Sequence, residues 1–161
     1  EIPLRLVGSE MCIRDRICHE LFEPDLIFCH LKVKDKKSLL SMLCNKLVDK
    51  GYVTKKYFKT VMERENMTPT SIGNGVAIPH GDTQEVNTAK IVIATLDKPI
   101  LWDSKYVDVV FLLVVKFSTD FEIRRTQQFY KQYIKLVDGD EQVSILRGFT
   151  SNIDFYRFLI Q

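Results

Sequence analysis

Apolar residues recur every three or four positions in two segments near the middle of the chain, which is the spacing of one helix face. Between Lys36 and Lys50 this spacing predicts an amphipathic helix, and Gly51 after it is a residue type that commonly ends helices. A second helix is predicted from Lys55 to about Glu65. The apolar positions of the first helix are Leu39, Leu40, Leu43, Leu47 and Val48.

Three shorter apolar runs predict strands, over Val76–Ile78, Ala89–Leu96 and Val107–Val115. The last run is apolar at nearly every position, which is typical of a strand buried on both faces. Further helices are predicted over about Glu122–Val137, Glu141–Arg147 and Ile153–Leu159. This alternation predicts an α/β fold, a three-layer sandwich in which helices flank a mixed central sheet, and we expect Trp102 to cap the core under a hairpin.

Composition and charge narrow the class of protein. A chain of 161 residues suits one domain with a real core, and a net charge of +2 with interspersed signs gives no footprint for nucleic acid. The sequence has neither an apolar run approaching the roughly twenty residues of a membrane span nor a secretory leader pattern. Scattered cysteines predict neither a zinc site nor a disulfide framework, so we expect a cytoplasmic protein without a metal. The cysteines are Cys12, Cys18, Cys29 and Cys44.

One histidine stands in a stretch whose backbone is tightly constrained. The residues from Gly73 to Gly81 read GNGVAIPHG, and His80 is the only histidine outside the first thirty residues. Pro79 fixes its own φ and pushes Ile78 towards an extended conformation, so a short strand should deliver one imidazole at a defined angle. An isolated histidine is more commonly a surface or core residue, yet no packing requirement explains Pro-His-Gly at the end of an apolar strand.

The segment from Arg64 to Gly81, RENMTPTSIGNGVAIPHG, resembles the active-site signature of the type-2 enzyme IIA domains. These domains form the fructose/mannitol class of the bacterial phosphoenolpyruvate-dependent sugar phosphotransferase system. The resemblance covers about residues 20–160 and implies that His80 carries a phosphoryl group and that Arg64 is the active-site arginine. It also implies a histidine phosphocarrier protein as the donor. The matching segments after the signature are Ala89–Leu96, Lys98–Trp102 and Val107–Val115.

The residue types in this segment suit phosphoryl transfer to a side chain. His80 supplies a nucleophilic nitrogen, and the planar fork of Arg64 fits phosphoryl oxygens better than a lysine does. Taken singly, Arg64 reads as a solvated residue at a helix end, so the combination with His80 carries the argument. Because the sequence has no Walker-type phosphate loop, we expect neither direct nucleotide use nor a cofactor. Further donors expected to support the phosphate are Thr70, Ser71, Asn74 and Gly75.

The resemblance fails at one position. Transport members of the family usually carry a second active-site histidine early in the helix after the last core strand, and that position falls on Thr126. Helical spacing predicts that Thr126 points inward near the site. A threonine cannot titrate, which suits a regulatory domain better than a high-flux transport component. The residues predicted to share its face are Ile123, Tyr130, Tyr133, Ile134 and Val137.

The beginning of the chain divides into two parts. Residues 1–16 look like translated sequencing-adapter read-through, so we exclude them and assign the IIA type-2 domain to residues 17–161. The stretch Ile17–Ile27 reads as a linker helix that runs into a proline-marked start. It resembles the entry to the C-terminal IIA-like domain of sugar-responsive transcriptional regulators and antiterminators. We therefore expect the chain to be a fragment that lacks its upstream part.

Three functions follow from these observations. The first is a histidine-phosphorylated IIA-like domain that regulates transcription, together with upstream regulatory domains of the same chain. The second is a transport component that passes its phosphate to a IIB domain. The third is a degenerate protein-binding module without phosphoryl chemistry, which phosphorylation of His80 would exclude. No residue indicates which sugar is involved, because a IIA domain need not touch sugar.

Overall fold

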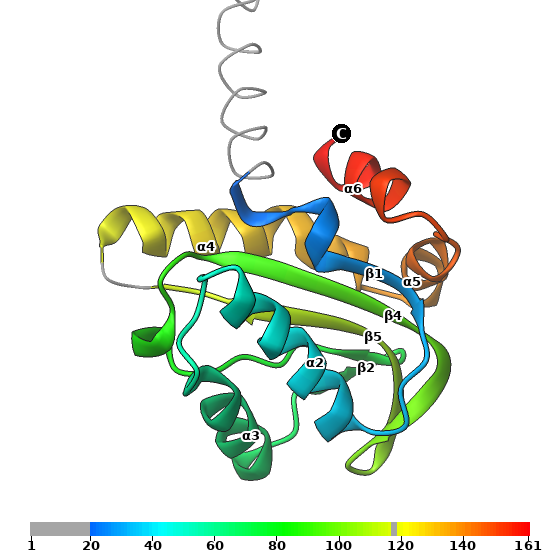
Figure 1. Ribbon diagram of the computed structural model, residues 1–161. Helices are drawn as coiled ribbons and strands as arrows, with labels where there is room; N and C mark the ends of the chain where they lie inside the picture. Colours follow the sequence, from blue (N-terminus) through cyan, green and yellow to red (C-terminus); the bar gives the residue numbers. More distant parts are fainter. Residues whose placement is uncertain (1–19, 117–118) are drawn as a thin grey trace, which may run out of the picture.

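The computed structural model describes residues 20–116 and 119–161 (Figure 1). The adapter-like segment 1–16 and the first residues of the expected domain, from Ile17, lie outside the described residues. The elements in chain order are η1 (Pro24–Leu26), β1 (Ile27–Leu31), α2 (Lys36–Asp49), α3 (Tyr57–Met67), β2 (Ser71–Gly73), β3 (Val76–Ala77), η2 (Thr83–Glu85), β4 (Lys90–Trp102), β5 (Lys105–Val114), α4 (Asp120–Tyr133), η3 (Ile134–Leu136), α5 (Asp140–Arg147) and α6 (Asn152–Ile160).

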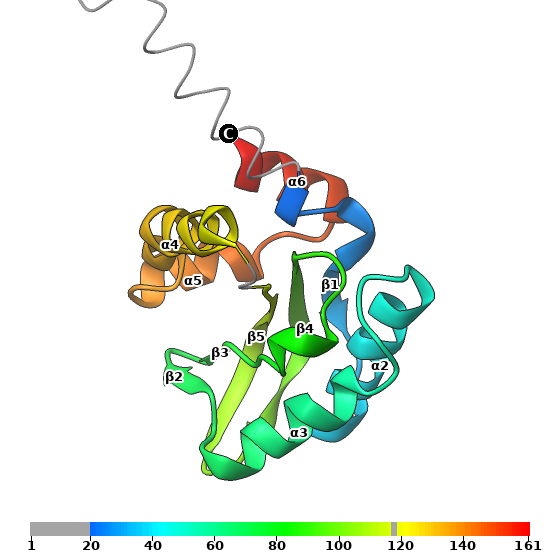
Figure 2. The same cartoon turned by 90° about the vertical axis from the view of Figure 1, so that its left-hand side faces the viewer.

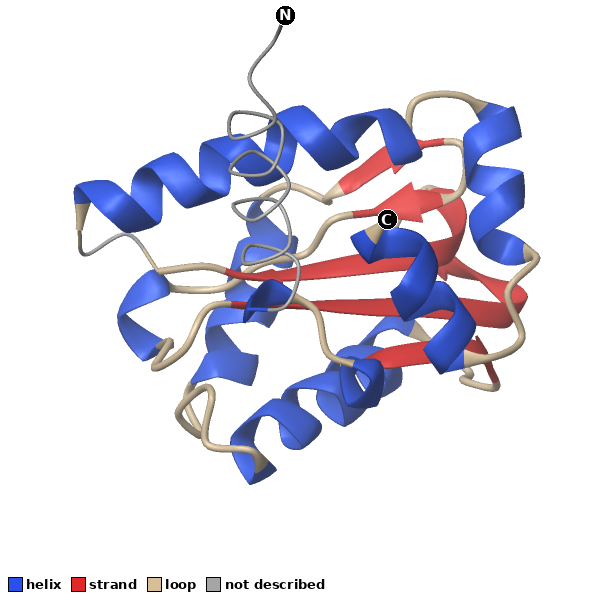
Figure 3. Ribbon diagram, turned by 90° about the horizontal axis from the view of Figure 1, so that it is seen from above, coloured by secondary structure: helices blue, strands red, loops and turns tan. Residues whose placement is uncertain are grey.

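The described strands form one five-stranded sheet in the order β1-β4-β5-β3-β2. The sheet is mixed, because β1 lies parallel to β4 and β3 parallel to β5, whereas β4 with β5 and β2 with β3 are antiparallel. Helices α2 and α3 cover one face, and α4, α5 and α6 cover the other (Figure 2). Seen from above, the strands lie between the two helical layers (Figure 3). The predicted three-layer α/β sandwich is confirmed.

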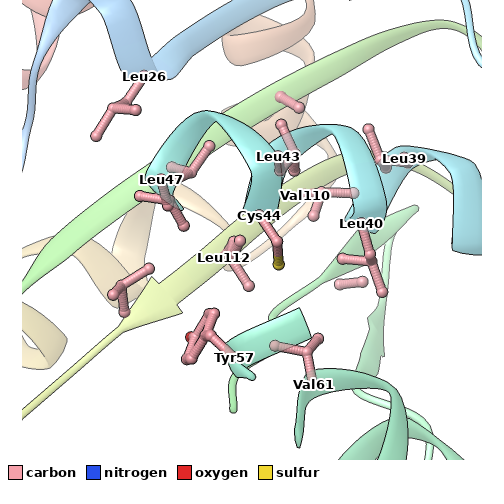
Figure 4. Packing of buried hydrophobic residues seen from close by; sticks show 14 of the residues in the cluster. Leu26, Leu39, Leu40, Leu43, Cys44, Leu47, Tyr57, Val61, Val110 and Leu112 are labelled. Carbon is pink, nitrogen blue, oxygen red and sulfur yellow. The ribbon is translucent and has the colours of Figure 1, made fainter. Parts of the chain in front are cut away.

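The sheet separates two apolar cores. On one side α2 and α3 press leucines, Cys44 and Tyr57 onto Val110 and Leu112 of β5 (Figure 4). On the other side Val109 and Phe111 of the same strand meet residues of α4, α5 and α6. Successive side chains of a strand point to opposite faces, so a strand covered on both faces must be apolar at every position. This explains the apolar run from Val109 to Val114 in β5.

Several element boundaries differ from those predicted. Helix α3 begins at Tyr57 and continues to Met67, so Arg64 lies in its last turn. Strand β4 extends to Trp102, where Asp103 with a φ of 62° turns the chain into β5. Trp102 is fully buried, as expected for a residue under the hairpin. Strands β1 and β2 lie in segments for which no strand was predicted.

The predicted inward face of α4 is partly wrong. Ile123 is 39% exposed and Ile134 is 48% exposed, whereas Phe129 is 6% exposed and packs into the core. Residues 122, 126 and 129, at helical spacing, line a small cavity against the sheet, so Thr126 does face inward but with different companions. The chain also leaves the α-helix at Ile134, where η3 begins and changes the phase of the later positions. The side chains of Tyr130 and Tyr133 lie outside the described set.

Candidate active site

His80 follows β3 after Ile78 and Pro79, at the level of the last residues of β5. Ala77 pairs with Val110, and His80 pairs with Leu113 in an isolated parallel bridge. The Leu113 amide donates to the Pro79 carbonyl oxygen at 2.9 Å. The backbone on the N-terminal side of the histidine is therefore tied to a central strand, and the half-buried ring is held at the end of the short strand β3, as the sequence indicated.

The imidazole of His80 contacts a backbone carbonyl, and this contact favours one tautomer of the neutral ring. Nδ1 lies 3.3 Å from the Ile78 carbonyl oxygen. A carbonyl oxygen can only accept, so this contact is a hydrogen bond when Nδ1 carries the hydrogen of the neutral ring. Nε2 then holds the free lone pair and is the nucleophilic nitrogen.

Arg64 is anchored beside the histidine segment. Its Nη1 donates to the Thr68 carbonyl oxygen at 2.8 Å. The Ile78 amide donates to the Thr70 carbonyl oxygen at 3.1 Å, so the chain two residues after Thr68 is bonded to the chain two residues before His80. An arginine has five N–H donors, so the contact with Thr68 does not exhaust them. Arg64 lies one helical turn beyond Thr60 on α3, and Thr60 Oγ1 accepts from the Asp82 amide after His80.

The buried carboxylate of Glu65 joins α3 to Thr70 and to Trp102. Glu65 is 2% exposed and accepts a hydrogen bond from the Trp102 indole Nε1 at 3.0 Å. It also accepts from the hydroxyl and the amide of Thr70, and the Lys36 ammonium lies 3.6 Å away. Sequence analysis missed this role. The available signal was an acidic residue at the third buried position of α3, after Tyr57 and Val61 at four-residue spacing.

The four expected phosphate donors do not converge on His80. The hydroxyl of Thr70 is bonded to Glu65, and Ser71 lies in β2 opposite Ala77. The carbonyl of Gly75 accepts from Val109, four residues along β5 from the partner of His80, which separates the turn at Asn74 and Gly75 from the histidine by about 13 Å.

The glycine-rich stretch forms the tight turn between two antiparallel strands. Asn74 and Gly75 have positive φ values of 56° and 77°, which such a turn requires. The Arg147 guanidinium bonds both carboxylate oxygens of Asp108, at 2.8 and 2.9 Å, and the Asn74 carbonyl oxygen at 2.6 Å. These contacts hold α5 against the turn, so the stretch serves the hairpin in this structure.

Thr126 lies over β4, the strand next to β5. It is half-buried, and its hydroxyl donates to the Glu122 carbonyl oxygen of its own helix at 3.0 Å. The small cavity that it lines includes Ile91, which pairs with Leu113 across β4 and β5. Leu113 in turn pairs with His80, so Thr126 faces the same end of the sheet from the α4 side.

An apolar groove continues from the histidine towards α4. Ile78, two residues before His80, and Leu113, the bridge partner of His80, both line it. The groove is lined by Ile72, Ile78, Phe111, Leu113, Phe129, Ile134 and Val137.

Other site types find little support in the described part of the chain. Residues 20–116 and 119–161 contain no group of three or more histidine, cysteine or acidic residues placed to hold a metal ion. Among these same residues no helix combines the length and apolar character needed to cross a membrane. Cys29 and Cys44 are free thiols, and burial raises the pKa of Cys44 to about 12, so it is an inert core residue. Cys12 and Cys18 lie outside the described residues.

Comparison with known proteins identifies the family. Residues 20–161 match the model of the phosphoenolpyruvate-dependent sugar phosphotransferase system EIIA 2 domains. The chain is 32% identical to the transcriptional regulator ManR of Bacillus subtilis over 136 residues, which are 84% of this chain and 20% of ManR. It is 35% identical over 95 residues to a mannitol-specific phosphotransferase enzyme IIA component of Staphylococcus aureus, covering 56% of this chain and 65% of that protein.

A solved structure supports the same assignment at the level of the fold. The complex of the mannitol enzyme IIA with phosphorylated enzyme IIB from Escherichia coli matches with a TM-score of 0.71 at 20% identity, covering 86% of this chain and 96% of the solved chain. The chain spans about a fifth of the length of ManR and about two thirds of the length of the staphylococcal component. From the family match over residues 20–161, the chain belongs to the EIIA type-2 family of the phosphoenolpyruvate-dependent sugar phosphotransferase system.

Proposed function

We propose that the chain is a cytoplasmic phosphohistidine carrier domain that accepts a phosphoryl group on His80 from the histidine phosphocarrier protein. The observation that supports this most directly is the contact between Nδ1 of His80 and the Ile78 carbonyl oxygen. It leaves Nε2 with the lone pair that a phosphoryl acceptor needs, and Arg64 lies on α3, the helix that contacts the chain after His80.

The transfer exchanges one phosphorus–nitrogen bond for another. The lone pair of His80 Nε2 forms a bond to the phosphorus of the donor's phosphohistidine, while the donor's phosphorus–nitrogen bond breaks and its electron pair stays on the donor ring. The hydrogen on Nδ1 remains in place. The Ile78 carbonyl stabilises the positive charge that the ring acquires, and Arg64 stabilises the phosphoryl oxygens. Positioning and charge stabilisation therefore carry the catalysis.

The domain's place in the cell is proposed to be regulatory, as a module of a sugar-responsive transcriptional regulator. The similarity to ManR over most of the chain supports this. So does Thr126, whose hydroxyl is bonded to its own helix and, unlike an imidazole, does not titrate near neutral pH. A component of sugar uptake is the second candidate, favoured by the similarity to the staphylococcal enzyme IIA component.

Phosphorylation of the purified protein tests the proposal. Incubation with phosphoenolpyruvate, enzyme I and the phosphocarrier should give an adduct that is labile in acid and stable in base, with nitrogen NMR placing phosphorus on Nε2 of His80. Absence of label, or label on another residue, would contradict the assignment. Adding a IIB domain then separates the two candidates, because rapid discharge favours uptake and retention favours regulation.

Replacing Arg64 by lysine is expected to slow phosphoryl transfer by roughly thirtyfold, or about 2 kcal/mol of transition-state stabilisation. Lysine keeps the charge but loses the fork that holds both the Thr68 carbonyl and the phosphoryl oxygens. Single-turnover labelling measures the rate. Arg157→Lys, an exposed change on α6, is the matched control. Equal rates for Arg64→Lys and Arg157→Lys would remove Arg64 from the site.

A further inference from the structure

One face of α3 lies against the chain that follows His80. Tyr57, Thr60 and Val61 occupy helical positions that share a face, and Arg64 extends this face by one further turn. An added Cβ at Gly81 would lie 2.6 Å from Thr60 Oγ1, 2.8 Å from Tyr57 Cε2 and 2.9 Å from Val61 Cγ2. Real Cβ atoms essentially never lie this close to another heavy atom. The backbone after the histidine is therefore pressed onto the helix that carries the arginine.

Thr60 joins this helix to the histidine segment through its hydroxyl. Thr60 Oγ1 accepts from the Asp82 amide at 2.9 Å and donates to the Tyr57 carbonyl oxygen at 2.7 Å. Asp82 follows His80 by two residues. The hydroxyl thus uses its donor and an acceptor site at once, and its orientation is fixed from both sides.

The same helix reaches the other neighbour of His80. The fully buried Tyr57 hydroxyl donates to the Leu113 carbonyl oxygen at 3.3 Å, and Leu113 is the bridge partner of His80. Burial raises the pKa of Tyr57 far above its usual value, and Cys44 raises it further, so the phenol keeps its proton and stays a donor. The histidine backbone is consequently held by α3 both directly and through β5.

The contact that sets the ring tautomer leaves little margin for movement. At 3.3 Å the separation between Nδ1 and the Ile78 carbonyl lies at the long end of the hydrogen-bond range. A small shift of the backbone around His80 would lengthen it beyond that range, and the hydrogen would then distribute over both ring nitrogens. The contacts that hold residues 81 and 82 therefore set the fraction of molecules in which Nε2 of His80 carries the free lone pair.

We propose that Thr60 is a positioning residue for phosphoryl transfer. Its hydroxyl holds the Asp82 amide, keeps the Nδ1 hydrogen of His80 on the Ile78 carbonyl, and locks the histidine to the helix that carries Arg64. The inference rests on the proposed function for its kinetic part. The effect of Thr60 on the His80 tautomer concerns the unphosphorylated protein and does not depend on that function.

A pair of substitutions at Thr60 tests this assignment. Thr60→Val has nearly the same shape without the hydroxyl, and it should lower kcat for phosphoryl transfer by about tenfold, with KM for the phosphocarrier unchanged. Nitrogen NMR of the His80 ring should show a smaller fraction with hydrogen on Nδ1. Thr60→Ser restores the hydroxyl and should return both readouts to within roughly twofold of the wild type.

Thr95→Val is the matched control, because the hydroxyl of the buried Thr95 also accepts from a backbone amide at 2.9 Å, that of His30. It should lose stability and keep the tautomer and kcat. A folded Thr60→Val protein with wild-type tautomer and kcat would overturn the assignment, as would a loss of activity that follows loss of fold with the tautomer unchanged. If the wild type takes no label but Thr60→Val still shifts the tautomer, the proposed function fails, and the effect of Thr60 on the His80 tautomer stands.

Discussion

The His80→Gln variant is expected to fold like the wild type and to lose phosphoryl uptake from the phosphocarrier by at least about a hundredfold. Glutamine has a polar side chain of similar reach, but its amide nitrogen has no free lone pair for phosphorus. The ring is half-buried and its Nδ1 contacts the Ile78 carbonyl oxygen, so its replacement should leave the two apolar cores intact. Label transferred from phosphoenolpyruvate, beside a melting curve, measures both properties.

His30→Gln is the control for this experiment. His30 is an exposed histidine of β1, at the opposite edge of the sheet from β2 and β3, so its replacement should leave labelling unchanged. Labelling of His80→Gln at the wild-type rate would show that phosphate resides elsewhere. Loss of label in His30→Gln alone would point to β1 in place of β3.

Glu65→Ala is expected to lower the free energy of unfolding by about 3 kcal/mol, or the melting temperature by roughly 10 °C. The change leaves the indole of Trp102 and the hydroxyl of Thr70 buried without the acceptor that each now has. The cost of a buried polar group without a partner exceeds the net value of the bond that it lost. Lys36 can turn towards water and adds little.

Urea unfolding measures this loss, with Glu63→Ala as the control. Glu63 is exposed on the same helix, and its replacement should change stability by less than about 0.5 kcal/mol. Equal stabilities for the two variants would show that the Glu65 network contributes nothing. A reduced labelling rate in folded Glu65→Ala would add that the network also aligns the chain before His80, because Thr70 pairs with Ile78.

Much of the fold could be predicted because its main elements carry strong local patterns. The helical spacing of leucines in α2 and the unbroken apolar run of β5 each point to one structure. Strand β2 has three residues, among them a serine and a glycine, and is too short to show any period. In α4 Phe129 is buried whereas Ile123 is exposed, so apolar residue type alone did not predict which side chains face inward.

The candidate site, like the fold, could be predicted only in part. The backbone preferences of Pro79 and Gly81 act on adjacent residues, so the placement of His80 was visible in the sequence. The bond from Trp102 to Glu65 joins residues 37 apart, and the bond from Asp82 to Thr60 joins residues 22 apart, so no local pattern reveals either. A glycine-rich stretch suits both a phosphate-binding nest and a hairpin turn, and only the pairing of β2 with β3 decides for the turn.

The contacts between α3 and the chain after His80 influence how the acceptor geometry forms during folding. The hydrogen bonds from the Asp82 amide to Thr60, from Arg64 to the Thr68 carbonyl and from the Ile78 amide to the Thr70 carbonyl all lie within residues 57–82. Chain segments this close in sequence meet at a small cost in loop-closure entropy, and contacts of low sequence separation form fast. The acceptor geometry is therefore encoded in one short stretch of chain, and the rest of the domain supplies the strand and the apolar layers on which that stretch settles.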